Sequence, residues 1–266
     1  MKGRGHIWIQ GAGELASGVA VRLFRSGFRV MMAETPRPLA VRRQVCFSEA
    51  VYSGLAEVEG VNGALLSPDA STYQPDLVAV VVDPDASVLE RLGADAVVDA
   101  RMTKKAPAAL PRGTAPLIGL GPGFTCGRDA DLIIETHREA QLGAVIDQGC
   151  AMPDTGIPGP VGGETGLRLL RAPAAGNLVS LFQIGDLVEE GVVVGHVGGL
   201  PVVSGLKGVI RGLVHPKAEL LAGDKVGDVD PRSGGLDTAL ISDKALAVAG
   251  GVLEALHRLK ILPAWG

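Results

Sequence analysis

The chain has 266 residues, of which 47% are hydrophobic, 20% are charged and 3% are aromatic, and its formal net charge is −4. This composition provides an aliphatic core for one large domain or two small ones. The acidic balance excludes the basic footprint of a general nucleic-acid binder, and the lack of a long apolar run argues against a membrane span. Because the three cysteines are widely spaced and favour reduced thiols, we expect a cytoplasmic protein.

Residues 1–148 are predicted to form a Rossmann-like domain, a doubly wound parallel sheet of the α/β class. Short aliphatic runs without polar–apolar alternation are typical of strands buried on both faces, and here they alternate with helical stretches. The runs lie at residues 6–9, 29–32, 77–82, 96–98, 116–118 and 132–134. Leu15, Val19 and Leu23 give the first connecting segment, residues 14–26, the apolar stripe of an amphipathic helix.

The composition changes after this domain. Residues 149–173 are rich in glycine and proline, which predicts a linker or an extended loop. Residues 174–235 contain short β-prone runs and two similar stretches, 184–191 and 221–227, and they resemble the barrel-sandwich fold of lipoyl and biotinyl carrier domains. Lys207 comes too late after the central turn to be the modified lysine of a carrier. Residues 236–266 are predicted to form a C-terminal helix capped by Ser242, and its Gly250–Gly251 pair favours close packing on the core.

The strongest signal for a binding site is the pattern Gly-x-Gly-x-x-Ala at residues 11–16, directly after the first predicted strand. Its first glycine permits a tight turn, its second lets the backbone approach a diphosphate, and the N–H groups of the following helix bind phosphate. Glu34, at the end of the second strand, is positioned to accept hydrogen bonds from ribose hydroxyls. The alternative is a purely structural glycine turn. The cofactor-binding residues predicted here are Gly11, Ala12, Gly13, Glu14, Leu15 and Glu34.

Other predicted strand ends supply further candidates, because the carboxyl ends of parallel strands gather at one edge of a sheet. A second glycine loop is either a binding loop that faces the first or a rigid turn. Asp83 is either a ligand-binding residue or the cap of the next helix. Two basic pairs, Arg42–Arg43 and Lys104–Lys105, either neutralise phosphates or lie on a solvated face. The residues of the second loop are Gly119, Gly121, Pro122, Gly123 and Phe124.

The cysteines and histidines form no recognisable metal motif. The sequence has no Cys-x-x-Cys, no His-Glu-x-x-His and no histidine cluster, so no metal site is predicted. Cys126 is the candidate reactive thiol because Arg128 follows it closely, although a buried, unreactive thiol is the default for each cysteine. The catalytic residues stay open, and so does the question of whether the protein is an enzyme.

Several stretches taken together resemble a known family: residues 11–30, 38–54, 118–136, 154–160, 227–232 and 241–256. Over nearly the whole chain they are similar to the YqeB-like family, accessory proteins of the selenium-dependent molybdenum hydroxylase system. The resemblance implies a role in maturing these hydroxylases, with the hydroxylase and cofactor-maturation proteins as partners. The glycine loops and the arginine pair of the family fall on the candidates named above. Cys126 stands where the family has a small residue.

These observations leave three functions to compare. The first is a maturation factor that binds molybdenum cofactor as its pterin dinucleotide, or a related nucleotide, during selenium insertion or cofactor delivery. The second is an NAD-dependent oxidoreductase, although no proton donor is evident near the loops. The third is a non-catalytic scaffold whose β domain binds the hydroxylase. No nucleic-acid or membrane partner is expected, and the apolar, glycine-rich composition is compatible with a homo-oligomer.

Overall fold

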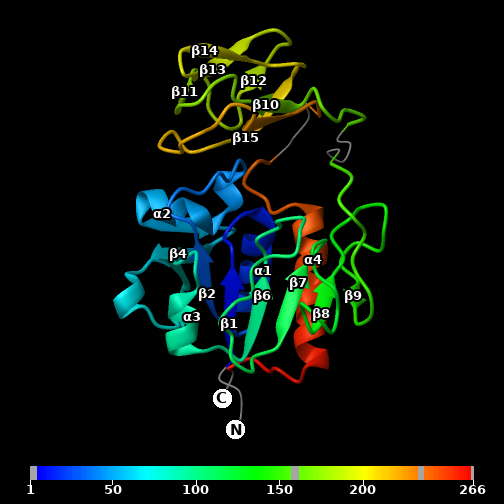
Figure 1. Cartoon of the computed structure of the whole chain (residues 1–266). Coiled ribbons are helices and arrows are strands. Elements are labelled where there is room, and N and C mark those ends of the chain that lie inside the picture. Colours follow the sequence, from blue (N-terminus) through cyan, green and yellow to red (C-terminus); the bar gives the residue numbers. More distant parts are fainter. Residues whose placement is uncertain (1–4, 157–161, 233–236, 265–266) are drawn as a thin grey trace. The chain divides into compact units, whose positions relative to one another are not determined.

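The computed structural model of the protein describes residues 5–156, 162–232 and 237–264, which form two compact units (Figure 1). Unit 1 comprises Met1–Pro36, Val45–Thr155 and Ile241–Gly266, and unit 2 comprises Arg37–Gln44 and Gly156–Leu240. The chain therefore leaves unit 1 twice and returns to it twice. The predicted linker at residues 149–173 and the motif at residues 154–160 lie partly outside the described residues.

In the described part of unit 1, nine strands form one mixed sheet with the order β3-β4-β5-β2-β1-β6-β7-β8-β9. The central strands are parallel, whereas β3 pairs antiparallel with β4 and β9 pairs antiparallel with β8. A strand is present at each of the six aliphatic runs found in the sequence. The strands are β1 (His6–Gln10), β2 (Arg29–Glu34), β3 (Leu55–Val58), β4 (Val61–Leu65), β5 (Val78–Val82), β6 (Ala96–Asp99), β7 (Leu117–Leu120), β8 (Leu132–Ile134) and β9 (Val145–Ile146).

The two faces of this sheet are covered differently. Alternation along β1 places Ile7 and Ile9 in the core under α1 (Glu14–Arg25) and α4 (Asp243–Arg258), while Trp8 points into the core on the other face. The second face is covered by the short helix α3 (Ser87–Leu92) and by loops. The remaining helices are short: α2 (Ala50–Ser53), η1 (Arg43–Val45), η2 (Phe47–Glu49) and η3 (Pro68–Ala70).

Helix α4 lies within residues 236–266, where the sequence predicted a helix, and it packs closely on unit 1. It begins after Ser242, whose hydroxyl accepts a hydrogen bond from the N–H of Ala245 at 3.2 Å. A Cβ at Gly18 of α1 would lie 2.9 Å from the Cβ of Ala245. A Cβ at Gly251 would overlap the carbonyl oxygen of Gly143, whereas one at Gly250 would meet no described atom within 4 Å. Of the two neighbouring glycines, only Gly251 is required by packing.

This difference predicts opposite effects for two neighbouring substitutions. Gly251→Ala should destabilise the protein by about 1–3 kcal/mol, because the added methyl group overpacks the contact between α4 and Gly143. Gly250→Ala should stabilise it by ~0.5–1 kcal/mol through helix propensity. Chemical denaturation of both variants and the wild type measures these changes. Equal effects of the two substitutions would contradict the close packing of α4.

The predicted Rossmann-like fold class is wrong. A doubly wound parallel sheet needs helical crossovers on both faces, but the connections from β6 to β7 and from β7 to β8 are loops. The hairpin of β3 and β4 and the antiparallel β9 make the sheet mixed. The reason for the error is physical: an aliphatic run indicates a buried strand, but it contains no information on the direction of the neighbouring strand or on what covers the face.

In the described part of unit 2, the strands form two antiparallel sheets, β10-β16-β15-β12 and β11-β13-β14. Several large hydrophobic side chains of this unit are more than half exposed, among them Leu167, Val179, Leu181, Leu187 and Leu221. The strands are β10 (Leu169–Arg171), β11 (Leu178–Ser180), β12 (Leu187–Val188), β13 (Val193–Val197), β14 (Leu200–Val203), β15 (Gly208–Leu213) and β16 (Lys225–Asp230).

The predicted barrel-sandwich is also wrong. The two similar stretches form the same turn, since Asp186 accepts a hydrogen bond from the N–H of Gln183 and Asp224 accepts one from the N–H of Leu221, each at 2.7 Å. The strands that follow, β12 and β16, both belong to the four-stranded sheet. The similarity therefore reflects a shared turn chemistry rather than two equivalent halves of a barrel.

Candidate functional site

The parallel strands of unit 1 end at one edge of the sheet, where the side chains of three buried carboxylates hold neighbouring backbone in place. Asp83 accepts hydrogen bonds from the N–H groups of Ser87 and Val88 at 3.0 and 2.8 Å, so it caps the start of α3. Asp99, only 1% exposed, is paired with Arg101. Glu135 accepts hydrogen bonds from Thr136, His137 and Met152 N–H groups. These carboxylates shape the loops that form the edge.

The first glycine loop joins β1 to α1 and leaves open space at the start of the helix. Gly11 has a φ of +107°, and a Cβ there would lie 3.1 Å from the carbonyl oxygen of Ala100. At Gly13, which caps α1, an added Cβ would meet no described atom within 4 Å. The positive end of the α1 dipole therefore lies beside space that an anion can occupy. Of the next two predicted residues, Leu15 packs against the core and Glu14 is half-buried.

Glu34 lies beside this loop and holds it. One carboxylate oxygen accepts a hydrogen bond from the N–H of Ala12 at 2.9 Å, and the other accepts from the N–H of Thr35 at 2.7 Å. The carbonyl oxygen of Ala12 in turn accepts from the N–H of Ser48 and the hydroxyl of Ser17, both at 3.0 Å. Each carboxylate oxygen can accept more than one hydrogen bond, so Glu34 keeps the capacity to bind a hydroxyl group.

The glycines of the second loop are required by packing within the protein. A Cβ at Gly119 would lie 2.6 Å from the buried ring of Phe124, and a Cβ at Gly121 would lie 2.5 Å from the hydroxyl of Thr136. A Cβ at Gly123 would lie 2.6 Å from the carbonyl oxygen of Lys105. Residues 100–105 thus contact Gly11 of the first loop and Gly123 of the second, so this segment lies between the two loops.

A basic cavity of about 570 Å³ lies beside the second loop. Lys104, which lines it, is paired with Asp154 at 2.9 Å. Its other polar lining includes two further cationic side chains and a thiol, and Pro122 of the second loop forms part of the wall. With Asp129, which is paired with Arg128 from outside the lining, three cations face two carboxylates, and this excess of positive charge favours a phosphate or a similar anion. The residues that line the cavity include Lys104, Lys105, Pro122, Arg128, Cys150 and Asp154.

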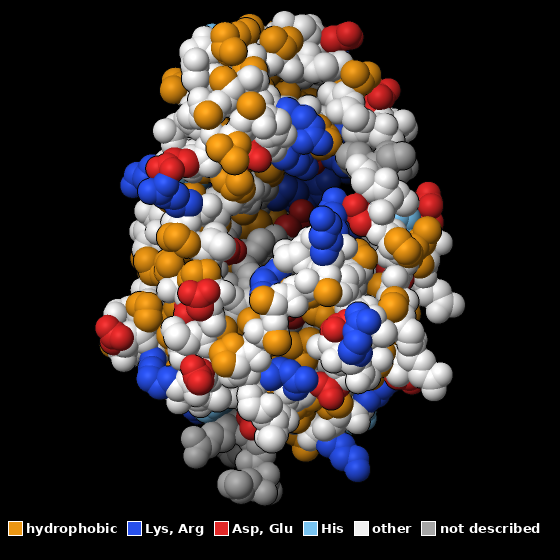
Figure 2. All heavy atoms as spheres, in the orientation of Figure 1, with side chains coloured by type: hydrophobic (Ala, Val, Ile, Leu, Met, Phe, Trp, Pro, Cys, Tyr) orange, Lys and Arg blue, Asp and Glu red, His pale blue; other side chains and the backbone are white. Residues whose placement is uncertain are grey.

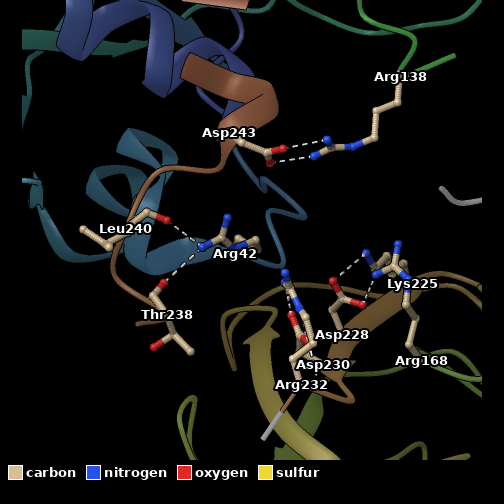
Figure 3. Close-up of polar contacts among 10 residues, drawn as sticks. All are labelled: Arg42, Arg138, Arg168, Lys225, Asp228, Asp230, Arg232, Thr238, Leu240 and Asp243. Atoms are coloured by element: carbon tan, nitrogen blue, oxygen red, sulfur yellow. Dashed lines mark hydrogen bonds and ion pairs between the residues drawn. The ribbon is translucent and has the colours of Figure 1, made fainter. Parts of the chain in front are cut away.

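Lys244 is a residue of this region that the sequence reasoning missed. Burial lowers the pKa of its amine, as does the charge of Arg138, whereas Glu14, Asp154 and Glu135 raise it. Of these neighbours, Glu14 lies at the start of α1 and Asp154 lines the basic cavity, so the amine of Lys244 is close to both places. Arg138 is held by a two-bond pair with Asp243, at 2.6 and 2.7 Å (Figure 3). A signal was present in the sequence, because a lysine in the first turn of a helix opposes the helix dipole.

The lowered pKa of Lys244 predicts a pH dependence of stability. Unfolding restores the ordinary lysine pKa of 10.5, so between the lowered value and 10.5 the unfolded chain binds more protons and stability rises with pH. We expect the unfolding free energy of the wild type, relative to Lys244→Met, to increase as the pH rises towards the ordinary lysine pKa of 10.5. The exposed Lys217 provides the control variant Lys217→Met. A difference that stays constant with pH would contradict the assignment.

The three cysteines lie in different environments, and no disulfide joins any of them. Burial raises the pKa of Cys126, and the charges of Asp147 and Asp131 raise it further. Arg128, the residue expected to favour a thiolate there, is instead hydrogen-bonded to Asp129. Cys150 is exposed in the basic cavity, with its sulfur 3.5 Å from the hydroxyl of Thr125. The thiol beside the cations is therefore Cys150.

Thiol alkylation should report this difference. With iodoacetamide at neutral pH, Cys150 should react faster than Cys126, because Cys150 is exposed while burial and two carboxylates keep Cys126 protonated. The buried Cys46 should react last. Peptide mass spectrometry over a time course measures the three rates. Faster labelling of Cys126 than of Cys150 would contradict the assignment.

Arg42 and Arg43 belong to unit 2. The guanidinium of Arg42 donates hydrogen bonds to the carbonyl oxygens of Thr238 and Leu240, at 3.2 and 2.8 Å (Figure 3).

Among the described residues there is no group of His, Cys, Asp and Glu side chains that could hold a metal ion. The described helices also include none long and apolar enough to cross a membrane.

Comparison with known proteins finds a relative over nearly the whole chain. The chain is 43% identical over 256 residues to the uncharacterized protein YqeB of Escherichia coli K12, an alignment that covers 95% of this chain and 47% of that protein. The chain thus spans about half the length of this relative. The match supports the resemblance to the YqeB-like family over the region that the two proteins share. No family model matches the chain.

Similarity to solved structures is low. An aspartoacylase family protein from Mesorhizobium loti is 12% identical with a TM-score of 0.27, and the comparison covers 86% of this chain and 85% of that one. The ectoine utilization protein EutE from Ruegeria pomeroyi is 11% identical with a TM-score of 0.26, covering 86% of each chain. Similarities at this level support no conclusion about the fold or activity of this chain.

Proposed function

We propose that the protein is an accessory factor in the maturation of selenium-dependent molybdenum hydroxylases, and that unit 1 binds molybdenum cofactor as its pterin dinucleotide or a related nucleotide. The observation that carries the binding proposal is the open space at Gly13, at the start of α1, with Glu34 beside the same loop. The role in maturation rests on the family resemblance. The proposal also includes a cytoplasmic location, the hydroxylase as a partner and assembly into a homo-oligomer.

The residues present are chemically suited to such a ligand. Backbone N–H groups at the start of α1 and the helix dipole favour a diphosphate, and the carboxylate of Glu34 can accept from a ribose hydroxyl. Residues 100–105 lead from this loop to the basic cavity, where Lys104, Lys105 and Arg128 can bind a further anionic group. Bound molybdenum cofactor would supply the metal and its pterin chemistry. The protein would supply binding, orientation and partial exclusion of water.

The contacts of Glu34 allow a direct test. Glu34→Ala should weaken binding of the pterin dinucleotide by about 1–3 kcal/mol, roughly 5- to 150-fold, because ligand hydroxyls lose their acceptor. Glu34→Gln keeps an oxygen for the N–H of Ala12 and should bind with intermediate affinity. Glu57→Ala, which removes an exposed carboxylate on β3, is the matched control and should bind like the wild type. Titration calorimetry measures the affinities.

The outcomes separate the candidate functions. Because Glu34 also holds the loop, thermal unfolding of each variant must show that it is folded. Preferential binding of NAD, weakened in the same variants, would replace the accessory role with an oxidoreductase. A folded wild-type protein that binds neither the pterin dinucleotide nor NAD would favour a scaffold. Equal affinities of the wild type and Glu34→Ala would place the nucleotide away from the first glycine loop.

A further inference from the structure

We propose that unit 2 contains a separate anion-binding site, suited to a small molecule that carries a phosphate group. The site is an arginine-rich cluster, defined as Arg168, Arg211, Lys225 and Arg232 together with Asp228 and Asp230. The sequence stretch 227–232, Gly-Asp-Val-Asp-Pro-Arg, supplies three of these residues, and the function proposed for unit 1 does not use them. Figure 2 shows Lys and Arg side chains grouped together on unit 2.

The base of the cluster is formed by two carboxylates on one strand. Asp228 and Asp230 are two residues apart on β16, so their side chains lie on the same face of the sheet. They are 4% and 1% exposed, respectively. Burying two carboxylates side by side is costly unless cations and hydrogen bonds compensate them. The sheet therefore needs neighbouring cations at this place.

The cations around these carboxylates are held in defined positions. Asp228 is paired with Arg168 and lies 3.9 Å from the amine of Lys225 (Figure 3). Asp230 accepts hydrogen bonds from Arg232 Nε at 2.9 Å and Nη2 at 2.7 Å. Burial alone would raise the pKa of Asp230, but the bonds from Arg232 and the charge of Arg211 lower it. Arg211 thus acts on the same carboxylate from the neighbouring strand, β15.

The cluster contains more positive than negative charge, and part of it is accessible. The set consists of four cations and two carboxylates, and the side chains of Lys225 and Arg232 are 38% and 54% exposed. Buried carboxylates hold the guanidinium groups in fixed positions, and this preorganises them for binding a ligand. The planar guanidinium group also matches the geometry of phosphate oxygens. A phosphate group would also reduce the repulsion among neighbouring cations. The geometry therefore favours a phosphate-bearing ligand over a neutral one.

A second sequence motif converges on this cluster. Residues 37–44 pack against β15 so closely that a Cβ at Gly212, next to Arg211, would lie 2.6 Å from the carbonyl oxygen of Val41. This packing places Arg42 and Arg43 on the segment beside Arg211. Arg43 also acts on His215, whose pKa is lowered by burial first and then by the charges of Arg43 and Lys217. The arginine pair therefore lies on a segment that packs next to Arg211 of the cluster.

Binding of inorganic phosphate and pyrophosphate to the full chain tests the proposal. Titration calorimetry at low ionic strength should show binding of pyrophosphate that Arg211→Gln and Lys225→Gln each weaken at least about tenfold. Arg37→Gln is the matched control, because Arg37 is an exposed arginine of unit 2 whose guanidinium is paired with Glu219, outside the cluster. It should leave the affinity within about twofold of the wild type. Thermal unfolding checks that each variant is folded.

Further variants separate this site from the one in unit 1. Because the proposed site of unit 1 also offers anion-binding groups, the titration is repeated in the Lys104→Gln/Lys105→Gln background, where Arg211→Gln and Lys225→Gln should still weaken the remaining pyrophosphate binding. If Arg211→Gln does not fold, Lys225→Gln alone decides, because the amine of Lys225 lies at the exposed rim. Pyrophosphate that fails to bind the wild type, or that binds both cluster variants as tightly as the wild type, would overturn the proposal. A loss caused only by the lysine double variant would assign the anion to the basic cavity instead.

Discussion

The docking of α4 on α1 is the contact on which the rest of unit 1 depends. The chain leaves unit 1 after residue 155 and returns at residue 241, so a helix from the end of the sequence completes the layer that covers one face of the sheet. Gly18 lets α1 approach α4, and Gly251 lets α4 approach the backbone at Gly143, at positions where a methyl group would not fit. Close approach of this kind increases dispersion contacts and excludes water from the aliphatic core. Without it, one face of β7, β8 and β9 would lose its cover.

This docking also determines which charges meet at the carboxyl edge of the sheet. It brings Asp243 and Lys244 to the end of unit 1 where α1 begins, so that Lys244 acts on Glu14, Asp154 and Glu135. The buried carboxylates of the edge mostly hold backbone N–H groups, which fixes the loops between strands. A ligand would therefore meet backbone donors, Glu34 and the lysines of residues 100–105. Binding groups held by such fixed loops lose little conformational entropy when a ligand is bound.

Much of the secondary structure of unit 1 could be predicted from the sequence, but its sheet topology could not. The aliphatic runs marked six strands, and the spacing of Leu15, Val19 and Leu23 marked α1, because burial on one or both faces determines these patterns directly. The antiparallel hairpin of β3 and β4 was missed, although its turn residues Glu59 and Gly60 both have positive φ and glycine is a recognisable turn signal. The direction of a strand depends on its connections and neighbours, which no local pattern encodes.

The candidate site was predictable to a similar extent. The sequence placed Glu34 beside the first glycine loop, and the structure has it there, but its hydrogen bonds to Ala12 and Thr35 could not be read from residue spacing. The sequence left the second loop as either a binding loop or a rigid turn. The structure shows that its glycines accommodate Phe124, Thr136 and Lys105, and ligand binding by this loop stays a prediction. Arg42 and Arg43 lie in unit 2 because residues 37–44 pack against Gly212, a contact between segments about 170 residues apart.

Native mass spectrometry of the protein from a host that makes molybdenum cofactor and is supplied with selenium tests the central claim most directly. The sample is then incubated with the pterin dinucleotide and with NAD, and Glu34→Ala is treated in parallel. We expect a bound pterin dinucleotide on the wild type and a reduced bound fraction on Glu34→Ala. Binding of NAD alone would contradict this expectation. So would a folded wild-type protein that carries no nucleotide after purification and binds none during the incubation.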